Sequence, residues 1–183
     1  MNNDHPDTNN RLIEDCLEGD IKAQFRLYKK YSMAMYNISV RITGNRMDAE
    51  DIIQESFMTV FSRLGELDNK AAFGSWLKRI VINNSVSLIR TKRVIFEDLD
   101  DSIESDETVI VETEDQIDPA IVHNAIKDLP DGGRAVLVLY ALEGYKHREI
   151  SQLLGISEST SKTQYKRALQ LLNNNLKKKI YAD

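Results

Sequence analysis

The sequence predicts an all-α protein. Its 183 residues include 8 glycines and 3 prolines, so long helices meet few interruptions. Apolar side chains recur three or four positions apart in several windows, which is the spacing of amphipathic helices, and the alternation typical of half-buried strands is weak throughout. We therefore expect two small helical domains joined by an acidic, flexible linker.

The distribution of charge places that linker. Residues 1–96 carry 14 basic and 12 acidic side chains, and residues 119–183 carry 10 basic and 6 acidic ones. Residues 97–118 between them carry 11 acidic side chains and no basic one. Like charges extend a chain, so we predict domains at 1–96 and 119–183 and a linker at 97–118. The sequence leaves two roles open for this linker. It is either a solvated connection without further role, or a polyanion that imitates DNA and covers a basic surface.

Several protein classes fit the sequence poorly. The longest apolar run, residues 135–142, is far shorter than the roughly 20 residues that span a bilayer, and the N-terminus lacks the pattern of a signal peptide. Cys16 is the single cysteine, and the three histidines are too far apart for a zinc motif. We expect a reduced, cytoplasmic protein that does not insert into membranes and uses no metal or other cofactor.

The first two predicted helices lie on either side of a short turn. Residues 21–42 carry apolar and aromatic side chains at helical intervals. Residues 44–46 then form a turn, and Asp48 is the predicted N-cap of the next helix, with Asp51 three positions on as in a capping box. The apolar stripe of this helix consists of Ile53, Phe57, Val60, Phe61 and Leu64.

The other face of this second helix is acidic and carries a methionine. It consists of Asp51, Gln54, Glu55 and Met58, at positions i, i+3, i+4 and i+7. An ordinary solvated face is one interpretation. A metal site or a carboxylate nuclease built on Asp48, Glu50, Asp51 and Glu55 is another, but it lacks a second cluster of ligands and a cleft.

The next helix, from residue 73 to about residue 90, has an apolar side and a cationic side. Leu77, Ile80, Val81 and Leu88 gather on the first. The second consists of Trp76, Arg79, Asn83 and Arg90, followed by Lys92 and Arg93. Such a strip is compatible with a packed tryptophan beside long cations, and equally with a surface that stacks on exposed bases and holds their phosphates.

The C-terminal segment reads as a helix-turn-helix. Helices are predicted at 119–129 and 134–142, then at 147–154, where the turn Gly155-Ile156-Ser157 leads into a last helix with Ser157 as N-cap. Two helices joined by a three-residue turn that contains glycine form the DNA-binding motif. Its second helix is expected to enter the major groove by its N-terminal residues.

The last helix separates into two faces. Ser161, Tyr165, Ala168 and Leu172 are predicted to point inward. The candidate DNA-contacting set offers hydroxyls for base edges and cations for phosphates. It consists of Ser159, Thr160, Lys162, Thr163, Lys166 and Arg167. A structural hairpin with a basic surface is the alternative, but turn chemistry, apolar lead-in and cationic face together favour DNA binding.

Taken in their order along the chain, these helices and motifs resemble those of the sigma-seventy family of bacterial initiation factors. The resemblance is to the extracytoplasmic-function (ECF) group of that family. Residues 48–57, DAEDIIQESF, are similar to the motif that binds core RNA polymerase, and residues 73–80 with Asn83 to the promoter-melting helix. The resemblance covers about residues 21–172. Matches to the fourth region are Leu129-Pro130, Arg134, Gly144-Tyr145, Glu149-Ile150, residues 154–157, Lys162 and Arg167-Ala168.

The resemblance implies a role for each surface, and it implies that the chain is not an enzyme. The acidic strip would bind a coiled coil on the largest polymerase subunit. The cationic strip from Trp76 to Arg93 would hold the minus-ten element as it opens, and the loop 64–72 would receive a flipped base. The last helix would read the minus-thirty-five element. The implied partners are core RNA polymerase, promoter DNA and an anti-sigma factor; the alternative is a stand-alone helix-turn-helix regulator.

Two residues depart from the pattern of the family. Ser159 and Ser161 stand where glycine and valine are usual. Ser159 changes the surface that faces the groove. Ser161 is on the inward face, where an unpaired hydroxyl costs about 1–3 kcal/mol. A hydrogen bond back to a carbonyl one turn earlier would satisfy it.

Overall fold

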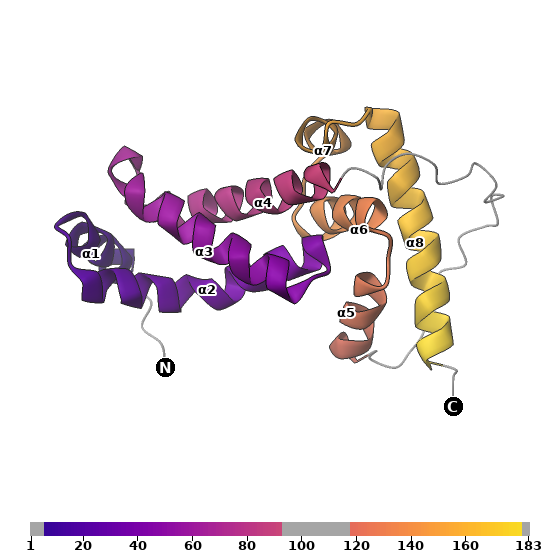
Figure 1. Ribbon diagram of the computed structural model, residues 1–183, viewed down its shortest axis with the longest axis horizontal. Helices are drawn as coiled ribbons and strands as arrows, with labels where there is room; N and C mark the ends of the chain where they lie inside the picture. The colour runs from indigo at the N-terminus through magenta and orange to yellow at the C-terminus, as the bar shows by residue number, and fades with distance from the viewer. Residues whose placement is uncertain (1–5, 93–117, 181–183) are drawn as a thin grey trace. The chain divides into compact units, whose positions relative to one another are not determined.

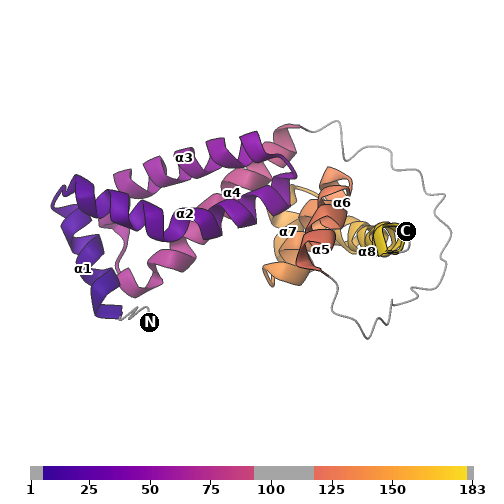
Figure 2. The ribbon, with the colours of Figure 1, turned by 90° about the horizontal axis from the view of Figure 1, so that it is seen from below.

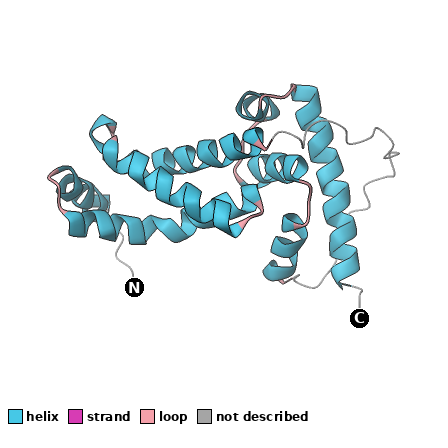
Figure 3. Ribbon diagram, in the orientation of Figure 1, coloured by secondary structure: helices cyan, strands magenta, loops and turns pink. Residues whose placement is uncertain are grey.

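The computed structural model describes residues 6–92 and 118–180, and within these ranges it is built of helices without strands (Figures 1 and 3). The all-α prediction is confirmed. Arg93 and nearly all of the predicted linker lie outside the described residues. In the described part, no helix is both long and apolar enough to cross a membrane. The N-terminal elements are α1 (Pro6–Leu17), α2 (Ile21–Thr43), α3 (Arg46–Ser62), the 3-10 turns η1 (Leu64–Glu66) and η2 (Lys70–Ala72), and α4 (Phe73–Thr91).

The C-terminal elements follow the acidic segment. They are α5 (Pro119–Lys127), α6 (Asp131–Leu137), a π-helical turn η4 (Val138–Leu142), α7 (His147–Leu154) and α8 (Glu158–Ile180). The chain forms two compact units. The first comprises Met1–Val40 and Asn45–Ser85, and the second Arg41–Gly44 and Val86–Asp183. The ends of α2 and α4 thus cluster with the C-terminal helices.

The core of the first unit lies among α2, α3 and α4, which run side by side in Figures 1 and 2. Leu27, Val60, Leu77 and Val81 are fully buried there. These residues belong to the apolar stripes of the three helices, so the helical period brings them to one side. Two polar pairs are enclosed with them and are satisfied: Ser39 Oγ is 3.1 Å from Ser85 Oγ, and Asn84 Nδ2 donates to Ser56 Oγ at 2.9 Å.

The start of α3 differs from the prediction. The N-cap is Asn45, not Asp48: its Oδ1 accepts from Met47 N at 2.8 Å and from Asp48 N at 3.3 Å. Asparagine caps a helix as well as aspartate does. Gly44, at φ +69, ends α2, and the chain begins the next helix two residues later. Asp48 lies in the first turn, where a negative charge interacts favourably with the helix dipole.

Helix α1 was not predicted. Its inner face carries Ile13 and Cys16, which are buried, and it contacts both 3-10 turns. Burial raises the pKa of the Cys16 thiol to about 11, with the nearby Asp15 and Asp20 adding to the effect. Pro6 at the first helical position is the sequence signal that would have indicated the helix.

In the second unit, α5, α6 and α7 all pack against α8. Val136, Leu139, Ile150 and Ala168 fill the space between them. The helix predicted at 134–142 begins three residues earlier, and its last turn widens into the π-helical η4 before Gly144, at φ +78, ends it. Such a widened turn inside a helix is rare in proteins.

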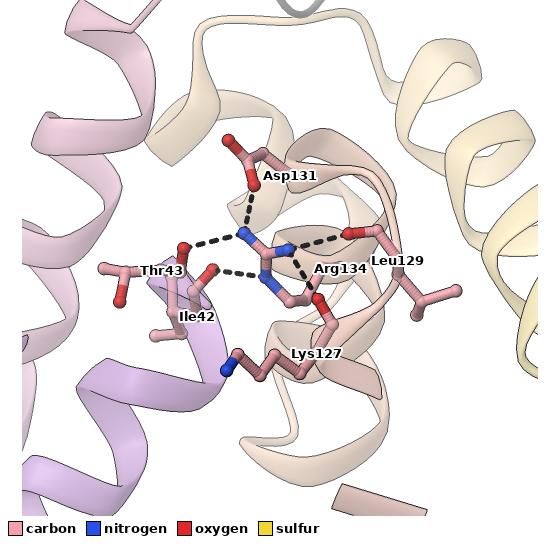
Figure 4. A network of polar contacts seen from close by, with 6 residues as sticks. All are labelled: Ile42, Thr43, Lys127, Leu129, Asp131 and Arg134. Atoms are coloured by element: carbon pink, nitrogen blue, oxygen red, sulfur yellow. Dashed lines mark hydrogen bonds and ion pairs between the residues drawn. The ribbon is translucent and has the colours of Figure 1, made fainter. Parts of the chain in front are cut away.

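One buried cation organises this unit (Figure 4). Arg134 is 3% exposed, and its guanidinium donates to one carboxylate and four main-chain carbonyls. A buried charge is tolerated when it is paired and hydrogen-bonded in this way. Arg134 also satisfies carbonyls at the C-terminal ends of α2 and α5, which no helical N–H reaches. The acceptors are Asp131 and the carbonyl oxygens of Ile42 (3.3 Å), Thr43 (2.7 Å), Lys127 (3.2 Å) and Leu129 (2.7 Å).

Candidate functional sites

The outer face of α3 presents the predicted acidic strip. Asp51, Gln54, Glu55 and Met58 are all exposed, Met58 by 74%, whereas Ile53 and Phe57 on the other face are buried. Within residues 6–92 and 118–180, neither Asp51 nor Glu55 has an ion-pair partner. Two carboxylates one helical turn apart therefore face solvent without compensation, beside an exposed apolar side chain.

A hollow between α2 and α3 adjoins this strip, and sequence reasoning missed it. Its volume is about 380 Å³. Phe25 and Met33 are exposed on the same helix, α2. Gln54 belongs to both the strip and the hollow, so the acidic and apolar areas form one continuous surface. The hollow is lined by Tyr28, Ser32, Met33, Tyr36, Glu50, Ile53 and Gln54.

The cationic strip of α4 is open to solvent. Arg79, Asn83, Arg90 and Lys92 are exposed, and Arg93 lies beyond the described residues. Trp76 is half-buried: its ring meets the edge of Phe73, with 6.3 Å between centroids. The tryptophan thus combines the two interpretations left open by the sequence, since part of its ring packs and part is accessible.

The turn of the helix-turn-helix has the predicted chemistry. Gly155 adopts the left-handed conformation, at φ +69 and ψ 34, that a side chain would strain. Ser157 is confirmed as the N-cap, since its Oγ accepts from Thr160 N at 2.9 Å. The same Oγ is 2.7 Å from Ser159 Oγ and 2.8 Å from Thr160 Oγ1. The hydroxyls of Ser159 and Thr160 are therefore engaged in the cap.

The outward face of α8 is basic. Lys162, Thr163 and Lys166 are exposed, and Arg167 is half-buried. Lys162 Nζ lies 2.8 Å from a carboxylate oxygen of Glu158, and this hydrogen bond lowers the pKa of Glu158. The charge of Lys162 is thus partly neutralised before any ligand binds. In the described ranges, Lys166 has no ion-pair partner.

The inward serine of α8 has a partner that sequence reasoning missed. Ser161 is fully buried, and its Oγ lies 3.0 Å from Nδ1 of His147 at the start of α7. The hydrogen bond to a carbonyl one turn earlier is therefore not the contact that satisfies it. His147 also stacks on Tyr140, with 4.4 Å between ring centroids and 14° between planes, and meets the edge of Tyr165. This cluster connects the two helices of the motif.

In the part of the chain that the structure describes, the remaining carboxylates and the single thiol, Cys16, form no metal centre. Among the residues that the structure describes, no three His, Cys, Asp or Glu side chains are placed to hold one metal ion.

The sequence of the chain matches two known protein-family models. The model for Sigma-70 region 2 matches residues 27–94, and the model for Sigma-70, region 4 matches residues 120–172. The chain belongs to the sigma-seventy family of RNA polymerase sigma factors. The two models together span more than half of it, in the order of the family.

Three of the proteins that this chain resembles are covered over nearly their whole length. The RNA polymerase sigma-H factor of Pseudomonas aeruginosa is 29% identical, with 91% of this chain and 92% of that one covered. The ECF RNA polymerase sigma factor SigW of Bacillus subtilis is 27% identical, with 91% and 96% covered. The sigma factor RpoE of Bartonella quintana, solved in complex with the anti-sigma factor NepR, shares the fold at 18% identity and a TM-score of 0.52, with 86% and 98% covered.

Family membership decides between the functional alternatives. The chain is an ECF sigma factor, a transcription initiation factor rather than an enzyme. The stand-alone regulator is not favoured, because a helix-turn-helix alone leaves the region 2 match over α2–α4 unexplained. The acidic residues considered for a nuclease lie within that region 2 match.

Proposed function

We propose that this sigma factor binds core RNA polymerase through residues 1–96, and that the same segment holds the minus-ten element while residues 119–183 read the minus-thirty-five element. The observation that carries the proposal is that one short chain contains both sigma regions in order. Each region also offers an exposed surface with suitable chemistry.

The polymerase-binding surface is the strip Asp51, Gln54, Glu55 and Met58. Uncompensated carboxylates attract a basic partner and guide its approach. Met58 and the neighbouring apolar side chains of α2 supply area that a partner can desolvate. A charged coiled coil on the largest polymerase subunit suits such a surface, because a helical partner can lie along α3.

The minus-ten surface is the strip on α4 with its loop. Arg79, Asn83, Arg90 and Lys92 are exposed for contact with phosphates and base edges, with Arg93 next in sequence. The accessible part of Trp76 can stack on an unpaired base, a contact worth about 1–3 kcal/mol. The loop 64–72 precedes α4 directly, and we assign to it the pocket for a flipped base.

The minus-thirty-five surface is the N-terminal half of α8. Lys162, Lys166 and Arg167 are placed for phosphates, and Thr163 for a base edge. Ser159 and Thr160 belong to the same set, but their hydroxyls also serve the cap. A hydrogen bond from either hydroxyl to DNA would therefore compete with the contacts that the same hydroxyl makes to Ser157 Oγ at the cap of α8.

An anti-sigma factor is the proposed regulator. The structural relative from Bartonella quintana was solved with such a partner. The hollow between α2 and α3, next to the acidic strip, is a surface that a regulator can cover in place of polymerase. Since core RNA polymerase is cytoplasmic in bacteria, we propose the cytoplasm as the site of action.

The polymerase-binding strip is tested by charge reversal. We expect Asp51→Lys with Glu55→Lys to abolish co-elution with core RNA polymerase, because both carboxylates would then repel a basic partner. The control is Glu18→Lys with Asp68→Lys, an equal change of charge at two exposed acidic residues outside α3, with co-elution with core polymerase as its only readout.

Folding is checked in the same samples by circular dichroism. Exposed substitutions usually change stability by less than about 0.5 kcal/mol. The proposal for the strip is wrong if the folded double variant still binds core polymerase like the wild type, or if the control loses binding to the same extent.

A further inference from the structure

The N-terminal helix α1 lies outside the residues matched by the region 2 model, yet it contacts the loop assigned to promoter reading. It packs against η1 and η2, which form most of the loop 64–72, at the end of the bundle where α2 begins (Figure 2). We propose that α1 is a positioning element for recognition of the minus-ten element. Its Glu14 holds the loop through Lys70, and its Asn9 holds Tyr31 of α2, which packs on Phe73 at the start of α4. The inference rests on the proposed role of the loop as a base pocket.

An ion pair connects helix and loop directly. Lys70 begins η2, and its Nζ lies 2.6 Å from Oε1 of Glu14, a residue 56 positions away in sequence. The other side-chain hydrogen bonds of the loop, within residues 6–92, are local: Arg63 pairs with Glu66, Asn69 accepts from Ala71 N, and Ser75 donates to Ala72 O. These local bonds shape the loop but do not attach it to the bundle.

Little burial holds the loop in place. Leu64 is buried, but Gly65, Glu66, Asp68 and Asn69 are exposed. A segment with few buried apolar contacts opens at low free energy. The contact with α1 therefore matters more here than the same contact would at a well-packed site.

Tyr31 makes a second connection, from α1 to the start of α4. Its hydroxyl donates to Asn9 Oδ1 at 3.3 Å, and its ring meets the edge of Phe73 with 5.1 Å between centroids. Gly74 permits this approach, because a Cβ there would lie 3.2 Å from Tyr31 Cε1. Phe73 in turn contacts Trp76. Helix α1 thus contacts the loop directly, and it is connected to Trp76 through Tyr31 of α2 and Phe73.

The contacts of α1 should affect how well the pocket distinguishes one base from another, and not how tightly the chain binds polymerase. A pocket that distinguishes one flipped base from another must keep its groups within about 0.5 Å of the productive geometry. Releasing α1 widens the range of loop conformations, so the correct base loses more binding than an incorrect one does. The acidic strip of α3 lies elsewhere on the unit, and its binding of polymerase is unaffected.

The test uses full-length chain, core RNA polymerase and a set of promoters that differ only at the base read by the loop. The measured quantity is the ratio of initiation rates between the best and the other bases. An exposed pair of this kind is worth about 0.2–1 kcal/mol, so Glu14→Gln should lower the ratio roughly 1.5- to 5-fold. Tyr31→Phe, which keeps the ring and removes the hydroxyl, should lower it in the same direction.

Reversal of the pair separates positioning from direct contact with DNA. In Glu14→Lys with Lys70→Glu the ion pair is restored, and the ratio should return toward the wild-type value although overall promoter affinity falls. The matched control is the pair Asp128–Lys179, 2.9 Å apart, with side-chain exposures of 52% and 36% against 54% and 32% for Glu14 and Lys70. Asp128→Lys with Lys179→Asp should leave the ratio unchanged.

Three results would overturn the inference. An unchanged ratio in Glu14→Gln and Tyr31→Phe, with normal polymerase binding, shows that α1 does not hold the pocket. A reversed pair that stays as poor as Lys70→Glu alone shows that Lys70 acts on DNA directly. If the wild-type chain gives no promoter-specific initiation, the proposed function itself fails, and the inference fails with it.

Discussion

The contact between Ser161 and His147 predicts that two substitutions together cost less stability than the sum of their separate costs. Three variants are needed: Ser161→Ala, His147→Phe and the combination of the two. Phenylalanine keeps an aromatic ring against Tyr140, which His147 stacks on at 4.4 Å. It removes both ring nitrogens, among them the Nδ1 that contacts the serine, so the two single variants break the same hydrogen bond from opposite ends.

The magnitudes follow from burial. Ser161→Ala removes a hydrogen bond of 3.0 Å, worth about 1 kcal/mol net, and the half-buried His147 can turn to water. His147→Phe strands a hydroxyl that is 0% exposed, at a cost of about 2 kcal/mol. The double variant removes donor and acceptor together and should cost about 1 kcal/mol. Adding Ser161→Ala to His147→Phe should therefore restore about 1 kcal/mol of stability, and the coupling energy of the cycle is about 2 kcal/mol.

The assay is hydrogen exchange of the full chain, read by mass spectrometry on peptides from α7 and α8. Local exchange is preferable to a melting temperature, because a chain with two compact units need not unfold in one step. Thr163→Ala, at an exposed position of α8, replaces Ser161→Ala in the control cycle. Costs that add within about 0.5 kcal/mol in the test cycle would refute the reasoning.

Three further predictions concern the cap of α3, the buried thiol and the outward face of α8. Asn45→Ala should lower the stability of the first unit by about 1 kcal/mol through loss of the N-cap; an unchanged thermal transition, followed by Trp76 fluorescence, would contradict it. Since the pKa of Cys16 is raised to about 11, the native thiol should react slowly with a disulfide reagent at pH 8, faster as pH approaches 11, and rapidly once unfolded; fast native labelling at pH 8 would show that the thiol is accessible. Lys162→Ala with Arg167→Ala should weaken binding of holoenzyme to promoter duplex and reduce the salt slope by about 0.9 for each phosphate that the protein no longer neutralises; undiminished binding would remove these two residues from the interface.

Apart from α1, the sequence predicted the helices and their faces, because the helical period alone decides which side chains share a side. The acidic strip of α3, the basic face of α8 and the cationic strip of α4 as far as Lys92 all reach solvent as expected. The turn at Gly155 was also predictable from a few neighbouring residues. Glycine favours the left-handed conformation there, and Ser157, two positions on, is a good N-cap.

Features that depend on contacts across the fold were not predictable in this way. Asp48 and Asn45 are both good caps, and only the course of the backbone after Gly44 selects Asn45. The partner of Ser161 is 14 residues away, on another helix. The acceptors of Arg134 come from three segments of the chain, and the contact of Glu14 with Lys70 spans 56 positions. Pairs at such separations have no signature in local periodicity.

The most direct measurement is reconstitution of transcription. The purified chain is mixed with core RNA polymerase from its own host, and transcripts are mapped on sheared genomic DNA. The account predicts discrete start sites that depend on the added chain and share sequence elements near minus ten and minus thirty-five. A folded chain that neither co-elutes with active core polymerase nor yields such start sites would contradict it.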